Sequence, residues 1–340
     1  MKRIVSIVII LCMALPLSGC AAKENYISGS FFAMDTVIEL KIAKGDYDAE
    51  ELFDECEKIV SEIENDISAT AEGSSTFIAN TDIDVMLDSG NFFEELLALS
   101  LDAAKKTSGA FDVTVGTLKQ LWESAASGGK EPHKEDIEKA KTYVGQALVS
   151  VSENKVEKAF KETRIDFGAV GKGYAEEKVV GYLISRGVSG GIISFGGNIA
   201  VFGEKSDGSE YRVSVRDPFD AENILGVVSM ESGYVSVSGD YERFIEIDGK
   251  KYNHIIDPLS GYPVDNGVHS AAVVCEDGAL ADILSTALFV MGKEKAIEFW
   301  RSGTYDFEAI IVTDDGVFAT AGLQSAFDAR KGLDIVYEER

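Results

Sequence analysis

The second half of the sequence contains a series of short apolar segments separated by tight turns, and this pattern limits the fold more than any other feature. Strands are expected over residues 144–151, 191–202, 211–216, 225–237, 242–248 and 268–275, with a final hairpin over residues 310–320. The dipeptide Asp248-Gly249 is typical of a two-residue hairpin turn. Hairpin-joined strands pair antiparallel, so the pattern favours an α+β fold with a largely antiparallel or mixed sheet over a doubly wound parallel sheet.

Helical patterns are inserted among these strands. Helices are expected over residues 47–66, 91–107, 132–140, 174–185, 279–291 and 293–302. Asp46 and Ser89 are expected as the N-caps of the first two, and a first strand is expected over residues 31–43. No linker divides the chain, so we expect a single domain over residues 29–340, built of two intimately packed lobes.

The N-terminus has the features of an export signal over residues 1–19. Lys2 and Arg3 precede an apolar run that is too short to span a bilayer comfortably. The following Leu-Ser-Gly-Cys resembles a bacterial lipoprotein cleavage box, which implies cleavage before Cys20, lipid on its sulfur and anchoring at the extracytoplasmic face of the cell membrane. Residues 20–28 would then be a lipidated tether. An ordinary signal peptide with a chance cysteine is the alternative.

The expected mature chain is strongly acidic. Without Lys2 and Arg3, 30 of the 32 basic residues remain against 58 acidic residues, which gives a net charge of −28. This argues against nucleic acid and against an anionic membrane surface as partners. A phosphorylated ligand would need a local positive centre or a bound cation. Cys56 and Cys275 both fit small core positions, and the sequence leaves a disulfide between them open.

Residues 166–175 combine three glycines with one charge of each sign. They follow an expected short strand over residues 163–165 and open an expected helix, where uncovered N–H groups favour anions. Asp166 and Lys172 would suit a phosphate group with a divalent cation beside it. A tight strand-to-helix turn that needs glycine for close packing explains the segment equally well, and the spacing matches neither the dinucleotide fingerprint nor the P-loop.

Two residues of the expected helix 279–291 form a second candidate site. Asp282 and Thr286 are four residues apart and therefore lie on one face. Their neighbours are apolar or small, so the acid is expected to be partly buried and to need a partner. Oxygen ligands of this kind suit a hard cation such as Mg²⁺. Helix capping is the alternative, because acids are favoured in a first turn.

Two further segments stand out. His254 ends an expected strand before a turn bounded by proline and glycine, where it would be a general base or a phosphate ligand, or a histidine satisfied by the turn itself. Gly196 and Gly197, followed by Asn198, interrupt another strand. Glycines at such a place indicate a bulge or a ligand close to the backbone.

Taken in order, these segments resemble the ApbE family, the FAD:protein FMN transferases. The resemblance runs over nearly the whole mature chain. Its motifs are residues 33–36, 108–116, 166–175, 194–198, 238–243, 254–263 and 281–287. It implies an ApbE-like fold related to the T-fold, with FAD in the cleft between the two lobes.

The resemblance also implies an activity and its partners. The family uses Mg²⁺ to move FMN from FAD onto a threonine or serine hydroxyl of another exported protein, and AMP leaves. The acceptor would be an FMN-binding subunit of an exported electron-transfer complex. The alternatives are an FAD pyrophosphatase that gives FMN and AMP, and a lipid-anchored FAD-binding protein without turnover. We disfavour the chain itself as the acceptor, because the nearest acceptor-like run, residues 107–111, ends in phenylalanine.

Site residues follow by position from the same resemblance. The implied magnesium ligands are the main-chain carbonyl of Ala169, Asp282 and Thr286, with Ser285 at a position where some members carry a second acid. The implied FAD contacts are Met34, Ala110, Phe111, Asp112, Asp166, Lys172 and Ile256, with Gly196, Gly197 and Asn198 bordering the same cleft. His254 or Asp257 is expected to accept the proton of the incoming hydroxyl. Residues 68–75 lack the aromatic that many members place beside the adenine.

Overall fold

The computed structural model describes residues 25–87, 92–205, 207–241 and 243–340. The expected signal peptide, Cys20 and the expected cap Ser89 lie outside these residues. No helix in the described ranges has both the length and the apolar character that a bilayer crossing requires. Cys56 and Cys275 are buried and free.

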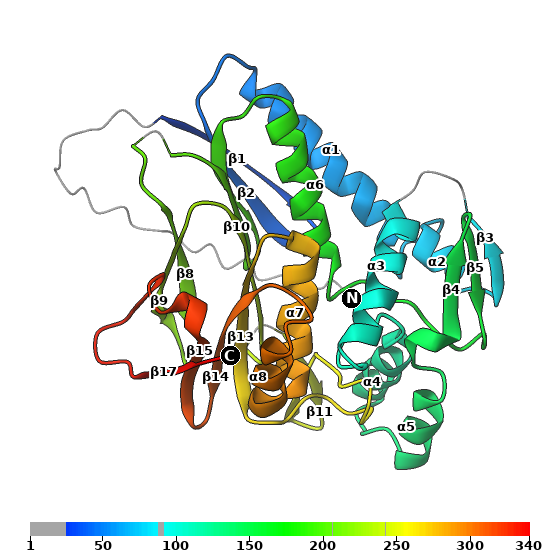
Figure 1. Cartoon of the computed structure of the whole chain (residues 1–340). Coiled ribbons are helices and arrows are strands. Elements are labelled where there is room, and N and C mark those ends of the chain that lie inside the picture. Colours follow the sequence, from blue (N-terminus) through cyan, green and yellow to red (C-terminus); the bar gives the residue numbers. More distant parts are fainter. Residues whose placement is uncertain (1–24, 88–91, 206, 242) are drawn as a thin grey trace.

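A mixed sheet forms the centre of the molecule (Figure 1). In the described part of the chain its strands run, in spatial order, β1 (Tyr26–Ala33), β2 (Thr36–Ala43), β6 (Gly190–Phe195), β7 (Asn198–Gly203), β10 (Gly233–Gly239), β13 (Val268–Cys275), β14 (Glu308–Thr313), β15 (Gly316–Thr320) and β17 (Ile335–Glu338). Neighbours are antiparallel except β15 and β17, which pair parallel. The α+β expectation is confirmed.

Turns divide three segments that the sequence pattern presents as single strands. Residues 31–43 form the end of β1 and all of β2, joined by Met34 and Asp35 with φ of 50° and 58°. The apolar alternation continues through this two-residue turn, which hides it. Because β1 begins at Tyr26, residues 26–28 of the expected tether pair with β2. Residues 191–202 are likewise divided by the β6–β7 turn. Residues 225–237 instead pass from β9 (Asp220–Met230), which belongs to another sheet, into β10 of the main sheet.

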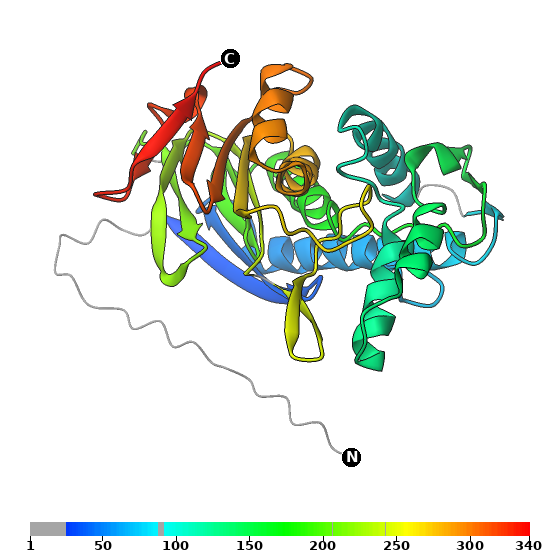
Figure 2. The same ribbon diagram turned by 90° about the horizontal axis from the view of Figure 1, so that it is seen from below.

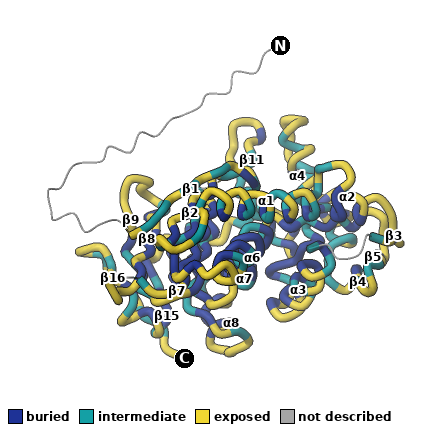
Figure 3. Tube along the Cα trace, turned by 90° about the horizontal axis from the view of Figure 1, so that it is seen from above, coloured by how far each residue is buried: buried dark blue, intermediate teal, exposed yellow. Residues whose placement is uncertain are grey.

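Helices cover one face of the main sheet (Figure 1). They are α1 (Ala49–Ile67), α6 (Gly171–Ser185), α7 (Gly278–Met291) and α8 (Lys293–Arg301). The side chain that caps α1 is Asp48 rather than the expected Asp46, and it accepts from the N–H groups of Glu50 and Glu51. Figure 3 shows α6 and α7 as largely buried elements. A smaller sheet, β16 (Phe327–Ala329), β9 and β8 (Tyr211–Asp217), closes a second apolar cluster with β14 and β15.

A second lobe stands beside the sheet lobe (Figure 2). It contains α2 (Ser75–Ala79), α3 (Phe92–Lys106), α4 (Gly116–Gly128), α5 (Lys134–Lys141), a short 3₁₀ turn (Gln146–Leu148) and a small sheet of β3 (Asp84–Met86), β5 (Lys155–Lys158) and β4 (Val149–Ser152). The hairpin of β11 (Phe244–Ile247) and β12 (Lys250–Asn253) projects between the lobes and confirms the Asp248-Gly249 turn.

The sequence pattern misses α4 and overstates a strand before α6. The alternation of residues 111–115 continues up to a glycine and conceals the start of α4, whose Leu118 and Trp122 are buried. Residues 163–165 form only an isolated bridge, between Arg164 and Val115. This bridge holds the 110–116 segment beside the turn that precedes α6, which is the arrangement the candidate site requires.

Candidate active site

The N-terminus of α6 lies directly against α7. The backbone N–H of Gly173 donates a hydrogen bond to Asp282 Oδ2 at 2.9 Å. A Cβ atom on Gly173 would lie 2.1 Å from the carbonyl oxygen of Gly278, so a side chain fits here only if the helices move apart. Gly173 therefore serves close packing, and that packing presents its N–H group to Asp282.

Hydroxyl groups of β10 complete the surroundings of Asp282. Ser236 Oγ lies 3.2 Å from Asp282 Oδ1 and 2.9 Å from Asn198 Oδ1 on β7. Ser238, two residues on and therefore on the same face of the strand, lies 2.9 Å from Ser285 Oγ and 3.1 Å from Thr286 Oγ1. These contacts assemble a carboxylate and several hydroxyl oxygens at one place between α6, α7 and the sheet.

The donor set fits a hard cation. Asp282 is 4% exposed, and none of the ion pairs among the described residues involves it. Thr286 is half-buried, whereas Ser285 is fully buried and donates to the Asp282 carbonyl at 2.9 Å. Ala169 lies in the turn before α6, which a hydrogen bond from Gly171 N to Phe167 O closes. Carboxylate, hydroxyl and carbonyl oxygens are the ligands that Mg²⁺ prefers.

Few acidic, sulfur or nitrogen side chains of the described residues surround Asp282. Within the ranges that the structure describes, no group of three or more His, Cys, Asp and Glu side chains is arranged to hold a metal. A cation beside Asp282 would thus take hydroxyl and carbonyl oxygens as most of its protein ligands.

His254 lies among cationic side chains. Its Nδ1 is 3.0 Å from the carbonyl oxygen of Arg243. Burial, together with the smaller effects of the charges of Arg243, Lys119 and Lys172, lowers the pKa of His254 to about 4, although the hydrogen bond to Arg243 opposes this shift. The imidazole is therefore neutral at pH 7, and the three basic side chains form a cationic centre that Asp166 and Asp35 partly neutralise.

Asp166 is held beside this centre. Its Oδ2 forms an ion pair with Lys119 at 2.7 Å, and its Oδ1 accepts from Gly168 N at 2.9 Å. Burial lowers the pKa of Lys119, but the charge of Asp166 and their hydrogen bond outweigh it and leave this pKa raised. Lys119 lies on the α4 helix that the sequence pattern misses.

The segment 110–112 is buried beside the turn that precedes α6. Ala110, Phe111 and Asp112 are all buried. Asp112 Oδ1 accepts from Thr114 N at 2.8 Å and from Thr114 Oγ1 at 2.6 Å. Burial raises the pKa of Asp112 despite these bonds.

Asp257 is engaged by its own turn. Its two carboxylate oxygens accept from the N–H groups of Leu259 and Ser260 at 2.9 and 3.2 Å. The neighbouring Ile256 is buried and bridges to Pro263. The turn is tied to the second lobe, because Trp122 Nε1 donates to the Gly261 carbonyl at 2.9 Å.

The remaining expected contacts lie on two hairpin turns. Met34 is half-buried next to Asp35, which is 4.0 Å from Arg243 and so approaches the His254 group. Gly196 and Gly197 form the β6–β7 turn with positive φ, and a Cβ on Gly196 would lie 2.0 Å from Thr36 Oγ1. Close approach of β2 thus explains this glycine without a ligand. Asn198 is 1% exposed and belongs to the Ser236 network.

Sequence reasoning overlooks four residues of this region: Lys119, Glu176, Ser236 and Ser238. The two serines alternate along β10, which is a weak signal for a shared face. Glu176 precedes Glu177 and Lys178 and so resembles part of a solvated helix face, yet it is 1% exposed.

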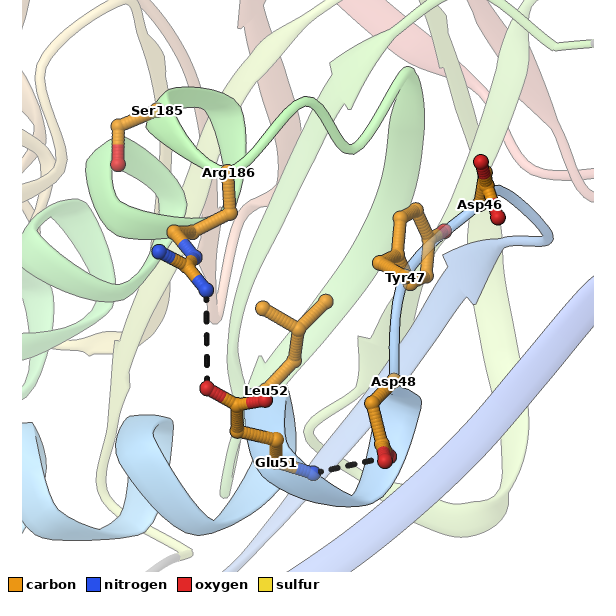
Figure 4. Close-up of a pocket in the computed structure, with 7 residues that line it drawn as sticks. All are labelled: Asp46, Tyr47, Asp48, Glu51, Leu52, Ser185 and Arg186. Carbon is orange, nitrogen blue, oxygen red and sulfur yellow. Dashed lines mark hydrogen bonds and ion pairs between the residues drawn. The ribbon is translucent and has the colours of Figure 1, made fainter.

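A separate hollow of about 330 Å³ lies where α1 begins and α6 ends (Figure 4). Glu51 and Arg186 approach within 3.7 Å across it. None of the expected site residues lines it, so it does not belong to the candidate active site.

Comparison with known proteins identifies relatives over most of the chain. A family model described as the ApbE family matches residues 34–311. The FAD:protein FMN transferase of Haemophilus influenzae is 29% identical over 329 residues, which cover 93% of this chain and 95% of the relative. The enzyme of the same name from Vibrio cholerae is 29% identical over 318 residues, which cover 90% and 93%.

Solved structures agree with the sequence comparison. The ApbE protein of Thermotoga maritima has a TM-score of 0.80 at 28% identity, covering 90% of this chain and 100% of that protein. The Pseudomonas stutzeri flavinyl transferase ApbE, in its apo form, has a TM-score of 0.78 at 26% identity, covering 90% and 97%. Another match is the Vibrio cholerae flavin transferase with a histidine replaced by glycine.

Proposed function

The chain belongs to the ApbE family of transferases, and on this premise we propose that it is a magnesium-dependent FAD:protein FMN transferase. It would move FMN from FAD to a threonine or serine hydroxyl of an exported flavoprotein, with release of AMP. The observation that carries the proposal is the pairing of a buried carboxylate site at Asp282 with a cluster of cations around His254.

The carboxylate site would hold the cation. Asp282, Thr286 and the carbonyl of Ala169 are the proposed ligands, and Ser285 is a weaker candidate because its hydroxyl already contacts Ser238 and the Asp282 carbonyl. When bound, Mg²⁺ would neutralise charge on the pyrophosphate. The N–H of Gly173 fixes the orientation of the Asp282 carboxylate, so this ligand needs no rearrangement.

The cationic cluster would receive the rest of the nucleotide. Lys172, at the start of α6, is proposed to contact FAD, together with Asp166, Met34 and the backbone of residues 110–112. Gly196, Gly197 and Ile256 are proposed to border the same cleft, and Asn198 to support it from the buried side. Positioning and charge neutralisation supply most of the catalysis in displacements at phosphorus.

His254 is the better placed of the two expected proton acceptors. A carbonyl oxygen only accepts hydrogen bonds, so Nδ1 carries the proton toward Arg243 O and Nε2 keeps its lone pair. Nε2 would accept the proton of the incoming hydroxyl as its oxygen attacks the phosphorus of the FMN half and the bond to AMP breaks. Both oxygens of Asp257 are already engaged by the turn.

We further propose that the protein is a lipoprotein anchored through Cys20 at the extracytoplasmic face of the cell membrane. The acceptor would be an exported FMN-binding protein of an electron-transfer complex. The deciding experiment is mass spectrometry of such a protein after incubation with this enzyme, FAD and Mg²⁺. A mass gain equal to FMN supports transfer. Release of free FMN and AMP without that gain identifies a pyrophosphatase, and intact FAD identifies a binding protein.

A further inference from the structure

Glu176 is a buried carboxylate directly behind the Asp282 site. It lies one helical turn after Gly173 on α6, so the two residues share the face that meets α7 and β7. Its side chain is 1% exposed. The backbone N–H of Ala200 on β7 faces its carboxylate, and Asn198, two residues earlier on the same strand face, reaches Asp282 through Ser236.

The polar atoms here are incompletely paired. Glu176 Oε1 and Asn198 Nδ2 are both buried and have no hydrogen-bond partner in the part of the chain that the structure describes. An unpaired polar atom in the interior costs free energy, and a charged one costs much more. Protein interiors rarely retain such groups, and those retained are found disproportionately at functional sites.

Two neighbouring acids, Glu176 and Asp282, therefore lack a protein cation. The negative charge of Asp282 acts on Glu176, and the charge of Lys172 opposes this effect more weakly. No ion pair connects Lys172, or another basic residue of the described ranges, with either acid. Two carboxylates, a hydroxyl and an amide oxygen around one buried place are the environment that a divalent cation neutralises.

We propose that Glu176 is a second carboxylate of the Asp282 cation site, a positioning residue that sets the affinity of this site for a divalent cation. The inference rests on one part of the proposed function, namely that a cation binds at Asp282. Removing a residue that supports a metal ligand from outside the coordination sphere typically lowers metal affinity by about 10- to 100-fold.

The test is direct cation binding by the whole protein without FAD. Mn²⁺, followed by electron paramagnetic resonance, serves as the probe for the Mg²⁺ site. Glu176→Gln preserves the shape and removes the charge. We expect its Kd for Mn²⁺ to rise roughly tenfold or more, with a thermal midpoint no lower than that of the wild type, because an amide is easier to bury than a carboxylate. An unchanged Kd would overturn the proposal.

A matched control is available in Glu308, which also has a buried oxygen without a partner but lies at the start of β14 beside Gly322. Glu308→Gln should leave the Kd for Mn²⁺ unchanged; an equal rise would mean that the effect is not specific to Glu176. If Glu176→Gln does not fold, Glu176→Met fills a similar volume without polar atoms, and the same loss of affinity is expected. Asp282→Asn separates the two proposals. If this variant binds Mn²⁺ as the wild type does, the cation site itself is refuted. If Asp282→Asn loses Mn²⁺ binding while Glu176→Gln keeps the wild-type Kd, only the role of Glu176 is refuted.

Discussion

His254 Nδ1 faces the carbonyl oxygen of Arg243 at 3.0 Å, which fixes the tautomer of the imidazole and leaves Nε2 for chemistry. Arg243 therefore acts on His254 twice, through its backbone as an orienting partner and through its side chain as a nearby positive charge. The first prediction concerns the pH at which this histidine is protonated.

The transfer rate should persist at acidic pH. Burial holds the pKa of His254 at about 4, below the ordinary value of 6.5, so the free base remains the main form as the pH falls through 6 and 5. Protonation removes the Nε2 lone pair, so kcat/KM should fall with an apparent pKa near 4. The measurement is kcat/KM for the acceptor protein from pH 4 to pH 8; a midpoint near 6.5 would show that His254 is not held neutral by its surroundings.

The same shift predicts an effect on stability. The unfolded chain binds a proton at His254 below pH 6.5, whereas the folded chain binds it only below about pH 4, so the unfolded state holds more protons in this window. The free energy of unfolding should therefore decrease as the pH falls from 6.5 to 4. His254→Gln should make this part of the pH dependence shallower in urea unfolding; an identical slope in wild type and variant would contradict the prediction.

The two expected proton acceptors should differ strongly on substitution. His254→Gln removes the base and should lower kcat by roughly 100-fold or more. Asp257→Asn should leave kcat within a few-fold, because its carboxylate serves the turn, and should lower stability by about 1 kcal/mol. Single-turnover transfer and chemical denaturation measure the two effects. The reverse order of the two rates would assign the proton to Asp257.

Thr286 and Ser285 provide a matched pair at the proposed cation site. Thr286→Val removes a half-buried hydroxyl and should raise the Mg²⁺ concentration that gives half the maximal rate by roughly tenfold. Ser285→Ala removes a fully buried hydroxyl that already contacts Ser238 and Asp282, and should raise this Mg²⁺ concentration less. Transfer rates across a Mg²⁺ titration give both values, and a larger effect at Ser285 would move the ligand assignment to that residue.

Gly173→Ala should destabilise the fold. Its Cβ would lie 2.1 Å from Gly278 O and 2.7 Å from Asp282 Cβ, and overpacking of this kind typically costs about 1–3 kcal/mol. Gly181 lies on the same helix with no atom within 4 Å of such a Cβ, so Gly181→Ala should be neutral or stabilising by up to about 1 kcal/mol. Equal effects in urea unfolding would mean that the α6–α7 contact is not tight.

The sequence pattern predicts the elements that have a continuous apolar run or a regular helical period. The apolar run of β13 and the periodic positions of α7 and α8 lead to the observed bounds within one residue. The β1–β2 turn escapes because Met34 and Asp35 carry none of the usual glycine signals, although both adopt positive φ. Local pattern contains no information on such a conformation when ordinary side chains adopt it.

Some residues of the candidate site can likewise be predicted from local sequence, and others cannot. Asp282 and Thr286 are visible because their helical spacing and apolar neighbours are local features. Ser236 is not, since its role depends on pairing between strands far apart in sequence. Glu176 is obscured by the charged residues that follow it, and only the approach of β7 shows that it is buried.

The contact between Gly173 and Gly278 brings two helix backbones together without intervening side chains. Backbones this close cannot slide past each other, so the N–H of α6 and the carboxylate of α7 form one rigid unit. The proposed cation ligands on these helices would thus be assembled during folding rather than on nucleotide arrival. Binding free energy from the nucleotide would then remain available for orienting the phosphorus toward the incoming hydroxyl.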